Sequence, residues 1–347
     1  MDAGTGHVAI LGAGSFGTAV ATIATRNGHS VVIYCRNAEQ VASINEMHRN
    51  PRRLSEYELS PLIRATTDFS AAVTGAMLMV HCIPAQMTPA FLSAHAHEIP
   101  RDVPLVSTAK GIVVETMELM SEAIPRVLGA PLPPLAYMSG PSFAKEMMLG
   151  HPMALVVASD DIEVARGVQR VLGSTFFRLY ITTDVVGVEV GGAIKNPLAI
   201  GAGMADGLGY GQSTLAALVS RGMGEMAKLA AAMGGRPETL AGLSGVGDLM
   251  LTSFSTLSRN RTLGYRMAKD GLTLEEAIAS LGQVAEGVAT ARVAAALCKR
   301  HGLDLPIFGA MSEILDGRIT PKDALRALMS RPAEGEGIAL SDVAPST

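Results

Sequence analysis

A lysine in an apolar, glycine-rich stretch is the residue with the clearest potential for chemistry. The stretch reads Gly187-Val-Glu-Val-Gly-Gly-Ala-Ile-Lys195-Asn196-Pro197. Burial disfavours a charged ammonium group, so we expect the pKa of Lys195 to fall toward the working pH. Such a lysine can donate a proton to a carbonyl oxygen while a hydride adds to the carbon. Asn196 could orient the substrate or Lys195, whereas a snorkelling surface lysine would not need the glycines.

Two further polar segments follow strand-like runs in the first half of the chain. Lys110 follows the run Leu105–Thr108, and Gly140-Pro-Ser142-Phe-Ala144-Lys follows the run Leu135–Ser139. Open α/β sheets bind ligands at the carboxyl ends of parallel strands. We therefore expect Lys110 to lie at a ligand site, and the turn at Gly140 and Ser142 to offer N–H groups and a hydroxyl to a substrate.

A third polar segment lies in the second half of the chain. Asp248 stands within the glycine-rich apolar stretch 243–252, so we expect it to pair with a lysine or with a substrate hydroxyl. Ser258-Arg-Asn-Arg follows, in which Ser258 is expected to cap a helix. Arg259 and the N–H groups of that helix start could cradle a phosphate. As an isolated pattern this is a plain capped helix start about twice as often as an anion site.

The N-terminal run Val8–Leu11 leads into Gly12-Ala-Gly14-Ser-Phe-Gly17, which a helix follows. The first glycine permits a tight turn, the second lets the backbone approach a pyrophosphate, and the third lets helix and strand pack closely. The phosphates would lie at the helix N-terminus. Because the motif follows a strand and opens a helix, it predicts a dinucleotide site; the alternative is a glycine turn in an unrelated α/β protein.

Arg36 stands at the end of the second strand-like run, where a carboxylate would select a free ribose 2′-hydroxyl. An arginine there can pair with a 2′-phosphate or stack on adenine. We therefore expect NADPH to be accepted, alongside NADH. A solvated arginine at a strand end is the alternative.

These residues need a framework of strands and helices. Short β-branched runs alternate with helical stretches from His7 to about Tyr180, which predicts βαβ units and a parallel sheet. The expected strands are Val8–Leu11, Ser30–Cys35, Met77–Cys82, Leu105–Thr108, Leu135–Ser139, Ala154–Ala158 and Phe176–Tyr180. The expected helices between them include Thr18–Asn27, Pro89–His97 and Ile162–Leu172.

The second half of the chain is helical by pattern. The expected helices are Val186–Gly203, Ser213–Met233, Leu263–Asp270, Leu274–Ala279, Thr290–His301, Pro306–Leu315 and Pro321–Met329. The fold class is therefore α/β, with a Rossmann-like dinucleotide-binding domain over residues 1–184 and an all-α substrate and catalytic domain over residues 185–330. The tail, 331–347, is expected to be flexible.

Length and composition narrow the classes of protein. The 347 residues fit two domains, and 28 basic against 32 acidic side chains give a net charge of −4, which argues against a nucleic-acid binder. No apolar run approaches the ~20 residues of a membrane span. Three widely spaced cysteines predict neither a disulfide framework nor a zinc site. We expect a soluble cytoplasmic protein, or one of the plastid stroma if the start is processed or trimmed.

Taken together, these segments resemble NAD(P)-dependent glycerol-3-phosphate dehydrogenases of the bacterial and plastid type, in the family's order over roughly residues 7–330. Unrelated Rossmann proteins share only the first of the matching pieces. The pieces are Gly12–Ala19, Ser107–Ile112, Ser139–Glu146, Gly187–Asn196, Ala199–Gly207, Gly242–Thr252, Ser258–Thr262 and Gln283–Thr290.

The resemblance implies reversible reduction of dihydroxyacetone phosphate to sn-glycerol 3-phosphate by NAD(P)H, without a metal, in a homodimer. By position, Lys195 matches the proton donor/acceptor, and further catalytic positions are Lys110, Asn196, Asp248 and Thr252. Matching substrate positions also include Gly140, Ser142, Ser258, Arg259 and Asn260. Matching cofactor positions are Gly12, Gly14, Ser15, Phe16, Gly17, Arg36, Lys110, Ala144, Arg259, Val284 and Glu286.

One departure from the family pattern concerns the catalytic helix. Pro197 stands where the family usually has an aliphatic residue, and it is expected to kink the helix beside Lys195. Two alternatives remain, a related 3-hydroxy-acid or sugar-acid dehydrogenase and a non-catalytic NAD(P) sensor. The first would lack the Gly-Pro-Ser and Ser-Arg-Asn pieces, and the second would not need Lys110, Lys195, Asp248 and Arg259 together.

Overall fold

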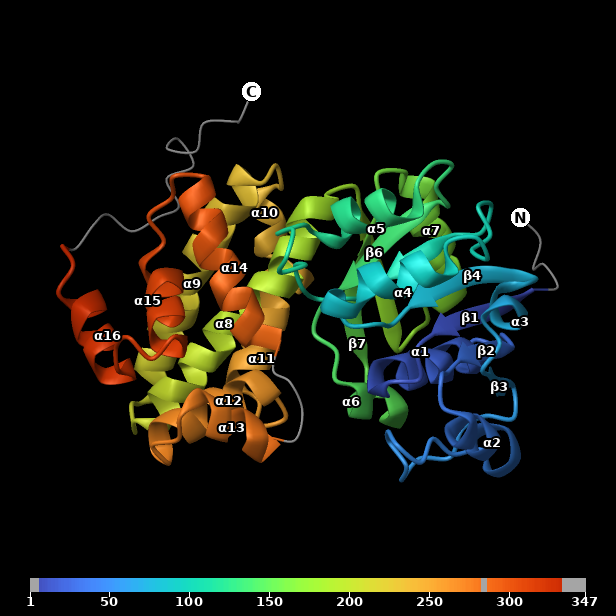
Figure 1. Ribbon diagram of the computed structural model, residues 1–347, viewed down its shortest axis with the longest axis horizontal. Helices are drawn as coiled ribbons and strands as arrows, with labels where there is room; N and C mark the ends of the chain where they lie inside the picture. Colours follow the sequence, from blue (N-terminus) through green and yellow to red (C-terminus); the bar gives the residue numbers. More distant parts are fainter. Residues whose placement is uncertain (1–5, 282–285, 333–347) are drawn as a thin grey trace. The chain divides into compact units, whose positions relative to one another are not determined.

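The computed structural model describes residues 6–281 and 286–332, which divide into two compact units (Figure 1). The first unit holds the described residues up to Lys110 together with Met120–Val185. The second holds Gly111–Leu119 and the described residues from Val186 on. The sequence pattern predicts residues 111–119 to lie in the first domain. Ile112 and Leu119 instead belong to a hydrophobic core of the second unit.

The first unit is built on one eight-stranded sheet with the order β3-β2-β1-β4-β5-β6-β7-β8. Its carboxyl edge is shared by several loops because β1 to β6 all run parallel. The strands are β1 His7–Leu11, β2 Val31–Tyr34, β3 Ile63–Thr66, β4 Ala76–His81, β5 Leu105–Ser107, β6 Leu135–Ser139, β7 Met153–Ala158 and β8 Phe177–Thr182.

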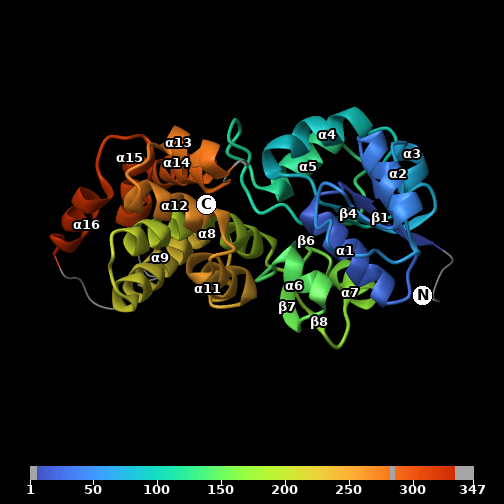
Figure 2. The same cartoon turned by 90° about the horizontal axis from the view of Figure 1, so that it is seen from below.

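Helices cover both faces of this sheet, with α4 and α5 on one face and α1 and α7 on the other (Figure 2). Strand residues such as Ile10 and Ile33 are fully buried beneath them, as in other sheets covered on both sides. The helices are α1 Ser15–Arg26, α2 Ala38–Met47, α3 Phe69–Val73, α4 Thr88–His95, α5 Met120–Leu128, α6 Ala144–Leu149 and α7 Ile162–Leu172, with a 3₁₀ turn at Ala85–Met87.

The sheet differs from the sequence expectation at two places. β3 was not expected, because its four residues include the exposed Arg64 and lie at the sheet edge. β7 runs antiparallel to β6, so the expectation of an all-parallel sheet is wrong there. For β7 to run parallel to β6, a crossover connection would have to carry the chain back to the other end of the sheet. The link between β6 and β7 holds only the short helix α6, which ends at Gly150 with φ 73°, and the chain turns back instead.

The second unit consists mainly of helices. They pack around two apolar cores, one containing Ile194 and Phe308 and the other Ile200 and Leu263. The helices are α8 Val185–Gly207, α9 Gln212–Ala232, α10 Pro237–Leu240, α11 Asp248–Phe254, α12 Arg259–Lys269, α13 Leu274–Leu281, α14 Glu286–Arg300, α15 Pro306–Leu315 and α16 Pro321–Met329, with a π-helical turn at Leu243–Gly247. Among the described residues, none of the helices has the length and apolar character needed to cross a membrane.

Two glycines let α8 and α12 cross in backbone contact. A Cβ added at Gly203 of α8 would lie 1.9 Å from the carbonyl oxygen of Arg261, and one added at Gly264 of α12 would lie 1.9 Å from that of Ile200. No side chain fits at either position. The crossing therefore fixes the middle of α12 against the C-terminal third of α8. Helical geometry in α8 continues through Pro197 without interruption.

Each unit also buries an ionisable group that is not among the predicted site residues. In the second unit, Glu225 of α9 accepts hydrogen bonds from the backbone N–H groups of Ile307 and Phe308 at 2.9–3.1 Å, and so caps α15 from another helix. Burial outweighs these bonds and raises the pKa of Glu225 to about 7. In the first unit, burial lowers the pKa of His81, at the end of β4, to about 4.

Candidate functional site

The turn after β1 is tight and depends on its glycines. Gly12 has φ 117°, and a Cβ at Gly17 would lie 2.1 Å from the Gly12 carbonyl oxygen, so both positions need glycine. At Gly14, the N-cap of α1, an added Cβ would meet no atom within 4 Å. The turn is thus tight on the protein side and open at the helix N-terminus, which fits a pyrophosphate. Ser15 and Phe16 form the half-buried first turn of α1.

Arg36 lies beside this turn. It follows β2, whose last residue, Tyr34, pairs in register with Leu11 at the end of β1, and the N–H of Gly12 donates to the Tyr34 carbonyl oxygen at 3.2 Å. Arg36 itself is exposed. Its place fits a contact with the adenosine end of a dinucleotide, and it fits a solvated strand end equally well.

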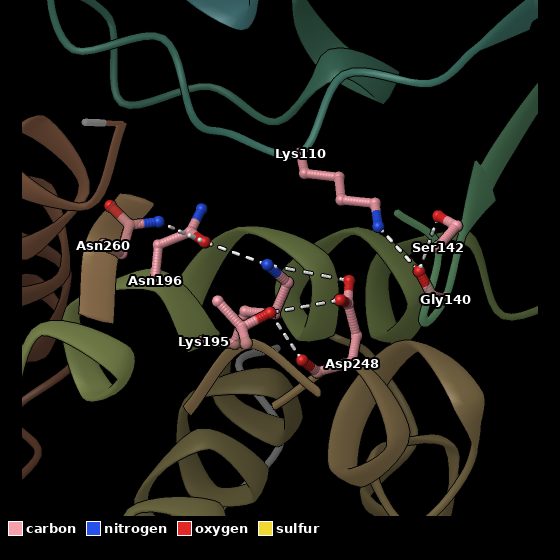
Figure 3. A network of polar contacts seen from close by, with 8 residues as sticks. Lys110, Gly140, Ser142, Lys195, Asn196, Asp248 and Asn260 are labelled. Atoms are coloured by element: carbon pink, nitrogen blue, oxygen red, sulfur yellow. Dashed lines mark hydrogen bonds and ion pairs between the residues drawn. The ribbon is translucent and has the colours of Figure 1, made fainter. Parts of the chain in front are cut away.

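Lys110, Gly140 and Ser142 lie together at the carboxyl ends of β5 and β6. The Lys110 Nζ donates to the Gly140 carbonyl oxygen at 2.7 Å, and the Ser142 Oγ donates to the same oxygen at 3.1 Å (Figure 3). Gly140 has φ 137°, where a side chain would be strained and would also press on Leu155. Both segments follow the carboxyl ends of neighbouring parallel strands, as the sequence predicts, and their role at a ligand site stays a prediction. Ala144 opens α6 and is half-buried against the core of the first unit.

In the second unit, Lys195 stands at the centre of a polar cluster within an otherwise apolar interior. It is 5 % exposed. Its Nζ donates to the Asn196 Oδ1 at 2.9 Å and lies 3.7 Å from the Asp248 Oδ2 (Figure 3). A buried cation and anion of this kind are tolerated only when each is paired. The expected burial of Lys195 and the expected pairing of Asp248 with a lysine are both seen.

The position of Asp248 is fixed by its own helix. It is the first residue of α11, directly after the π-helical turn, and this turn touches α8 at Gly191, where a Cβ would lie 2.7 Å from the Ser244 carbonyl oxygen. Thr252, one turn further along α11, donates from its Oγ1 to the Asp248 backbone oxygen at 2.6 Å and approaches its carboxylate at 3.3 Å. Asp248 is therefore held toward Lys195.

Asn260 connects three helices at the same cluster. Its Nδ2 donates to the Asn196 Oδ1 at 3.0 Å, and its Oδ1 accepts from the backbone N–H of Gly287 at 3.1 Å. The Asn196 oxygen thus accepts from both Lys195 and Asn260, which fixes the orientation of that amide. Gly287 of α14 was not among the predicted residues. A side chain there would collide with the Asn196 carbonyl oxygen at 2.9 Å, but the chain pattern alone gives no signal for this contact.

The remaining predicted residues of the second unit lie at helix starts. Ser258 is the N-cap of α12 and accepts from the Arg261 N–H at 3.2 Å, as expected for a capped start. Arg259, the first residue of α12, is exposed, and Glu286 opens α14. Val284 lies outside the described residues. Among the residues described, no group of His, Cys, Asp and Glu side chains could hold a metal ion.

Comparison with known proteins covers most of the chain. The family model for the NAD-dependent glycerol-3-phosphate dehydrogenase N-terminus matches residues 7–165, and that for the C-terminus of the same family matches residues 184–326. A glycerol-3-phosphate dehydrogenase [NAD(P)+] of Brucella canis is 46 % identical over 95 % of this chain and 98 % of its own length. A chloroplastic glycerol-3-phosphate dehydrogenase [NAD(+)] of Arabidopsis thaliana is 43 % identical over 94 % of this chain and 78 % of its own.

A solved structure agrees with these matches. The crystal structure of glycerol-3-phosphate dehydrogenase from Coxiella burnetii superposes with a TM-score of 0.88 at 32 % identity, over 94 % of this chain and 99 % of its own. The match spans both units, so it concerns the helical unit as well as the dinucleotide-binding one.

Proposed function

Because the chain belongs to the family of NAD-dependent glycerol-3-phosphate dehydrogenases, we propose that it transfers a hydride reversibly between NAD(P)H and dihydroxyacetone phosphate, with sn-glycerol 3-phosphate as the reduced product. The observation that carries this proposal is the buried amine of Lys195, held between Asn196 and Asp248. The nearly full-length match favours this function over the 3-hydroxy-acid dehydrogenase and sensor alternatives.

The first unit binds and orients the cofactor in this proposal. The open N-terminus of α1 at Gly14 takes the pyrophosphate, and Ser15, Phe16, Arg36 and Ala144 line the rest of the cofactor site. The bound nicotinamide supplies the hydride chemistry, while the protein orients the reactants and excludes water. Lys110 and Ser142, which both donate to the Gly140 carbonyl oxygen, belong to the loops that bind the substrate in this proposal.

The second unit supplies the group that donates and accepts the proton. As the substrate carbonyl is reduced, negative charge develops on its oxygen, and the Lys195 ammonium group stabilises that charge and donates the proton. Asp248 compensates the buried positive charge before transfer, and Thr252 keeps its carboxylate in place. Asn260 holds Asn196, which in turn holds Lys195. In the oxidative direction the neutral amine of Lys195 removes the proton from the substrate hydroxyl.

The substrate phosphate needs positive charge. In this proposal Arg259 and the first-turn N–H groups of α12 bind it, because a guanidinium pairs with phosphate in a bidentate manner and a helix N-terminus favours an anion. Ser258 serves as helix cap here, so its hydroxyl acts mainly by shaping that N-terminus. We further propose a homodimer in which α9 contributes to the interface, and a cytoplasmic location.

The test is NADPH oxidation with dihydroxyacetone phosphate by the purified protein and by Lys195→Met. We expect the variant to lose at least about a hundredfold in kcat, the lower range for a general acid, while its Kd for NADPH changes little. Lys322→Met, at an exposed position on α16, is the matched control and should keep wild-type turnover. A wild-type protein that folds and binds NADPH but reduces no dihydroxyacetone phosphate would overturn the proposal.

A further inference from the structure

We propose that Gln40 and Asn50 are positioning residues for the dinucleotide site, because their side-chain amides together hold the carbonyl oxygen of Ala13 in the glycine-rich turn. We call this pair the amide clasp. Neither residue is among the predicted site residues. The inference rests on the proposed function for its cofactor, and it adds a device that orients the cofactor-binding backbone.

Asn50 uses its whole hydrogen-bonding capacity in the clasp. Its Nδ2 donates to the Ala13 carbonyl oxygen at 3.1 Å and to the Thr18 Oγ1 at 2.8 Å. Its Oδ1 accepts from the Gln40 Nε2 at 2.7 Å and from the backbone N–H of Arg52 at 3.2 Å. A side-chain amide has two donors and two acceptor positions, and all four are occupied. Asn50 is fully buried, so its orientation is fixed.

Gln40 supplies the second bond to the same oxygen. Its Nε2 donates to the Ala13 carbonyl oxygen at 3.0 Å, and its Oε1 accepts from the Cys35 Sγ at 3.1 Å. Gln40 stands in the first turn of α2, where its backbone N–H donates to the N-cap side chain of Asn37 at 2.7 Å. The clasp therefore connects the turn after β1 with the end of β2 and the start of α2.

Holding this oxygen sets the direction of the next N–H group. The peptide unit between Ala13 and Gly14 is planar and trans, so its C=O and N–H point in opposite directions. Two hydrogen bonds on the Ala13 oxygen consequently aim the Gly14 N–H away from the clasp. Thr18 adds a further restraint, because its Oγ1 donates to the Gly14 carbonyl oxygen at 2.9 Å. The clasp thus fixes the backbone of the turn before an anion arrives.

A merely structural role must be separated from this one, since any buried amide network stabilises a fold. The chain offers a matched control in Asn45 of α2. Its side chain exchanges two hydrogen bonds with the backbone of Ala65 in β3, at 2.9 Å and 2.8 Å. Asn45 thus attaches the same helix to the same sheet through an amide, but it makes no contact with the glycine-rich turn.

The experiment compares Asn50→Ala, Gln40→Met and Asn45→Ala in the full-length protein. The Kd for NADPH is measured by cofactor fluorescence, and kinetics are measured with dihydroxyacetone phosphate at saturating NADPH. We expect the Kd and the KM for NADPH to rise about tenfold in the two clasp variants, the loss of one or two buried hydrogen bonds. The kcat and the KM for dihydroxyacetone phosphate should stay within about twofold. Asn45→Ala should lower Tm but leave the Kd unchanged.

A wild-type Kd in either folded clasp variant, or an equal rise in Kd in Asn45→Ala, would overturn the inference. Gln40→Met preserves side-chain length, so it decides the question if Asn50→Ala does not fold. Failure of the proposed function would be distinguishable. A wild-type protein without turnover could still be compared with the clasp variants by their Kd for NADPH.

Discussion

At the scale of single residues, Arg36 carries the choice of cofactor in our interpretation. It stands directly beyond β2, whose end adjoins the glycine-rich turn, and its guanidinium is exposed. A carboxylate at this position would bind a ribose 2′-hydroxyl and repel a 2′-phosphate, whereas a guanidinium attracts the phosphate. The preference between NADPH and NADH should therefore respond to a charge reversal at this side chain more than to the same reversal elsewhere on the unit.

We predict that Arg36→Asp lowers the ratio of kcat/KM for NADPH to that for NADH. The expected factor is about ten to a hundred, which corresponds to loss of a hydrogen bond to a charged group. Arg178→Asp makes the same charge change on β8, at the opposite edge of the sheet, and should leave the ratio unchanged. Steady-state kinetics with both cofactors measure it, and an unaltered ratio in Arg36→Asp would show that Arg36 is only a solvated strand end.

The sequence identifies the candidate catalytic side chains better than the residues that hold the site in place. Lys195 and Asp248 could be predicted because a charged residue in an apolar, glycine-rich stretch is costly to bury unless it is paired or functional. Gln40, Asn50 and Gly287 could not, since a glutamine, an asparagine and a glycine are common residues in helices and turns. Their roles arise from contacts with parts of the chain remote in sequence, such as Ala13 and Asn196. The catalytic and binding roles themselves stay predictions.

At the scale of elements, the crossing of α8 with α12 positions the polar cluster. Gly203 and Gly264 allow the two backbones to touch, and the Asn196–Asn260 hydrogen bond lies on the same pair of helices. The strongly patterned helices of this unit were predicted to within a few residues. The crossing was not, because a glycine inside a helix does not reveal which backbone it meets. β3 was not predicted, and the direction of β7 was predicted wrongly, for a similar reason. The neighbouring strands in the sheet determine whether a short edge strand forms and which way a strand runs.

We predict that Gly203→Ala destabilises the protein and impairs catalysis together. The added methyl group would overlap a backbone oxygen that cannot move aside, so we expect a loss of about 3 kcal/mol in the free energy of unfolding, the upper range for overpacking. The kcat should fall as well, because separation of the helices breaks the Asn196–Asn260 contact. Gly309→Ala on α15 meets only open space and should be neutral or stabilising. Urea denaturation and turnover measure both effects, and a Gly203→Ala protein as stable and active as Gly309→Ala would contradict the prediction.

At the scale of the whole molecule, the two units should respond to pH in opposite directions. The folded pKa of Glu225, about 7, lies above the ordinary 4.5, so its contribution to stability is present at low pH and is lost as pH rises toward 7. The folded pKa of His81, about 4, lies below the ordinary 6.5, so its contribution is present above pH 6.5 and is lost as pH falls toward 4. Each shift amounts to about 3 kcal/mol over its full range.

Glu225→Gln should isolate one of these effects. We predict that the variant is less stable than the wild type at pH 5 by a larger margin than at pH 8, because only the wild type gains from retaining a proton on Glu225 between pH 4.5 and 7. Differential scanning calorimetry at both pH values measures the margin. His81→Leu should show the reverse, with its disadvantage shrinking or turning into an advantage at pH 5. Equal margins at both pH values would contradict the shifted pKa values.

The nine residues from Gly111 to Leu119 have a consequence for how the two units are joined. Since they belong to the second unit while the chain on either side belongs to the first, the polypeptide passes between the units at three places, after Lys110, after Leu119 and after Val185. A protease that cuts once, near Val185, would leave two fragments held together only by the packing of Gly111–Leu119 in the second unit. A gene fragment starting there would encode a helical bundle deprived of Ile112 and Leu119, and so of part of its own interior.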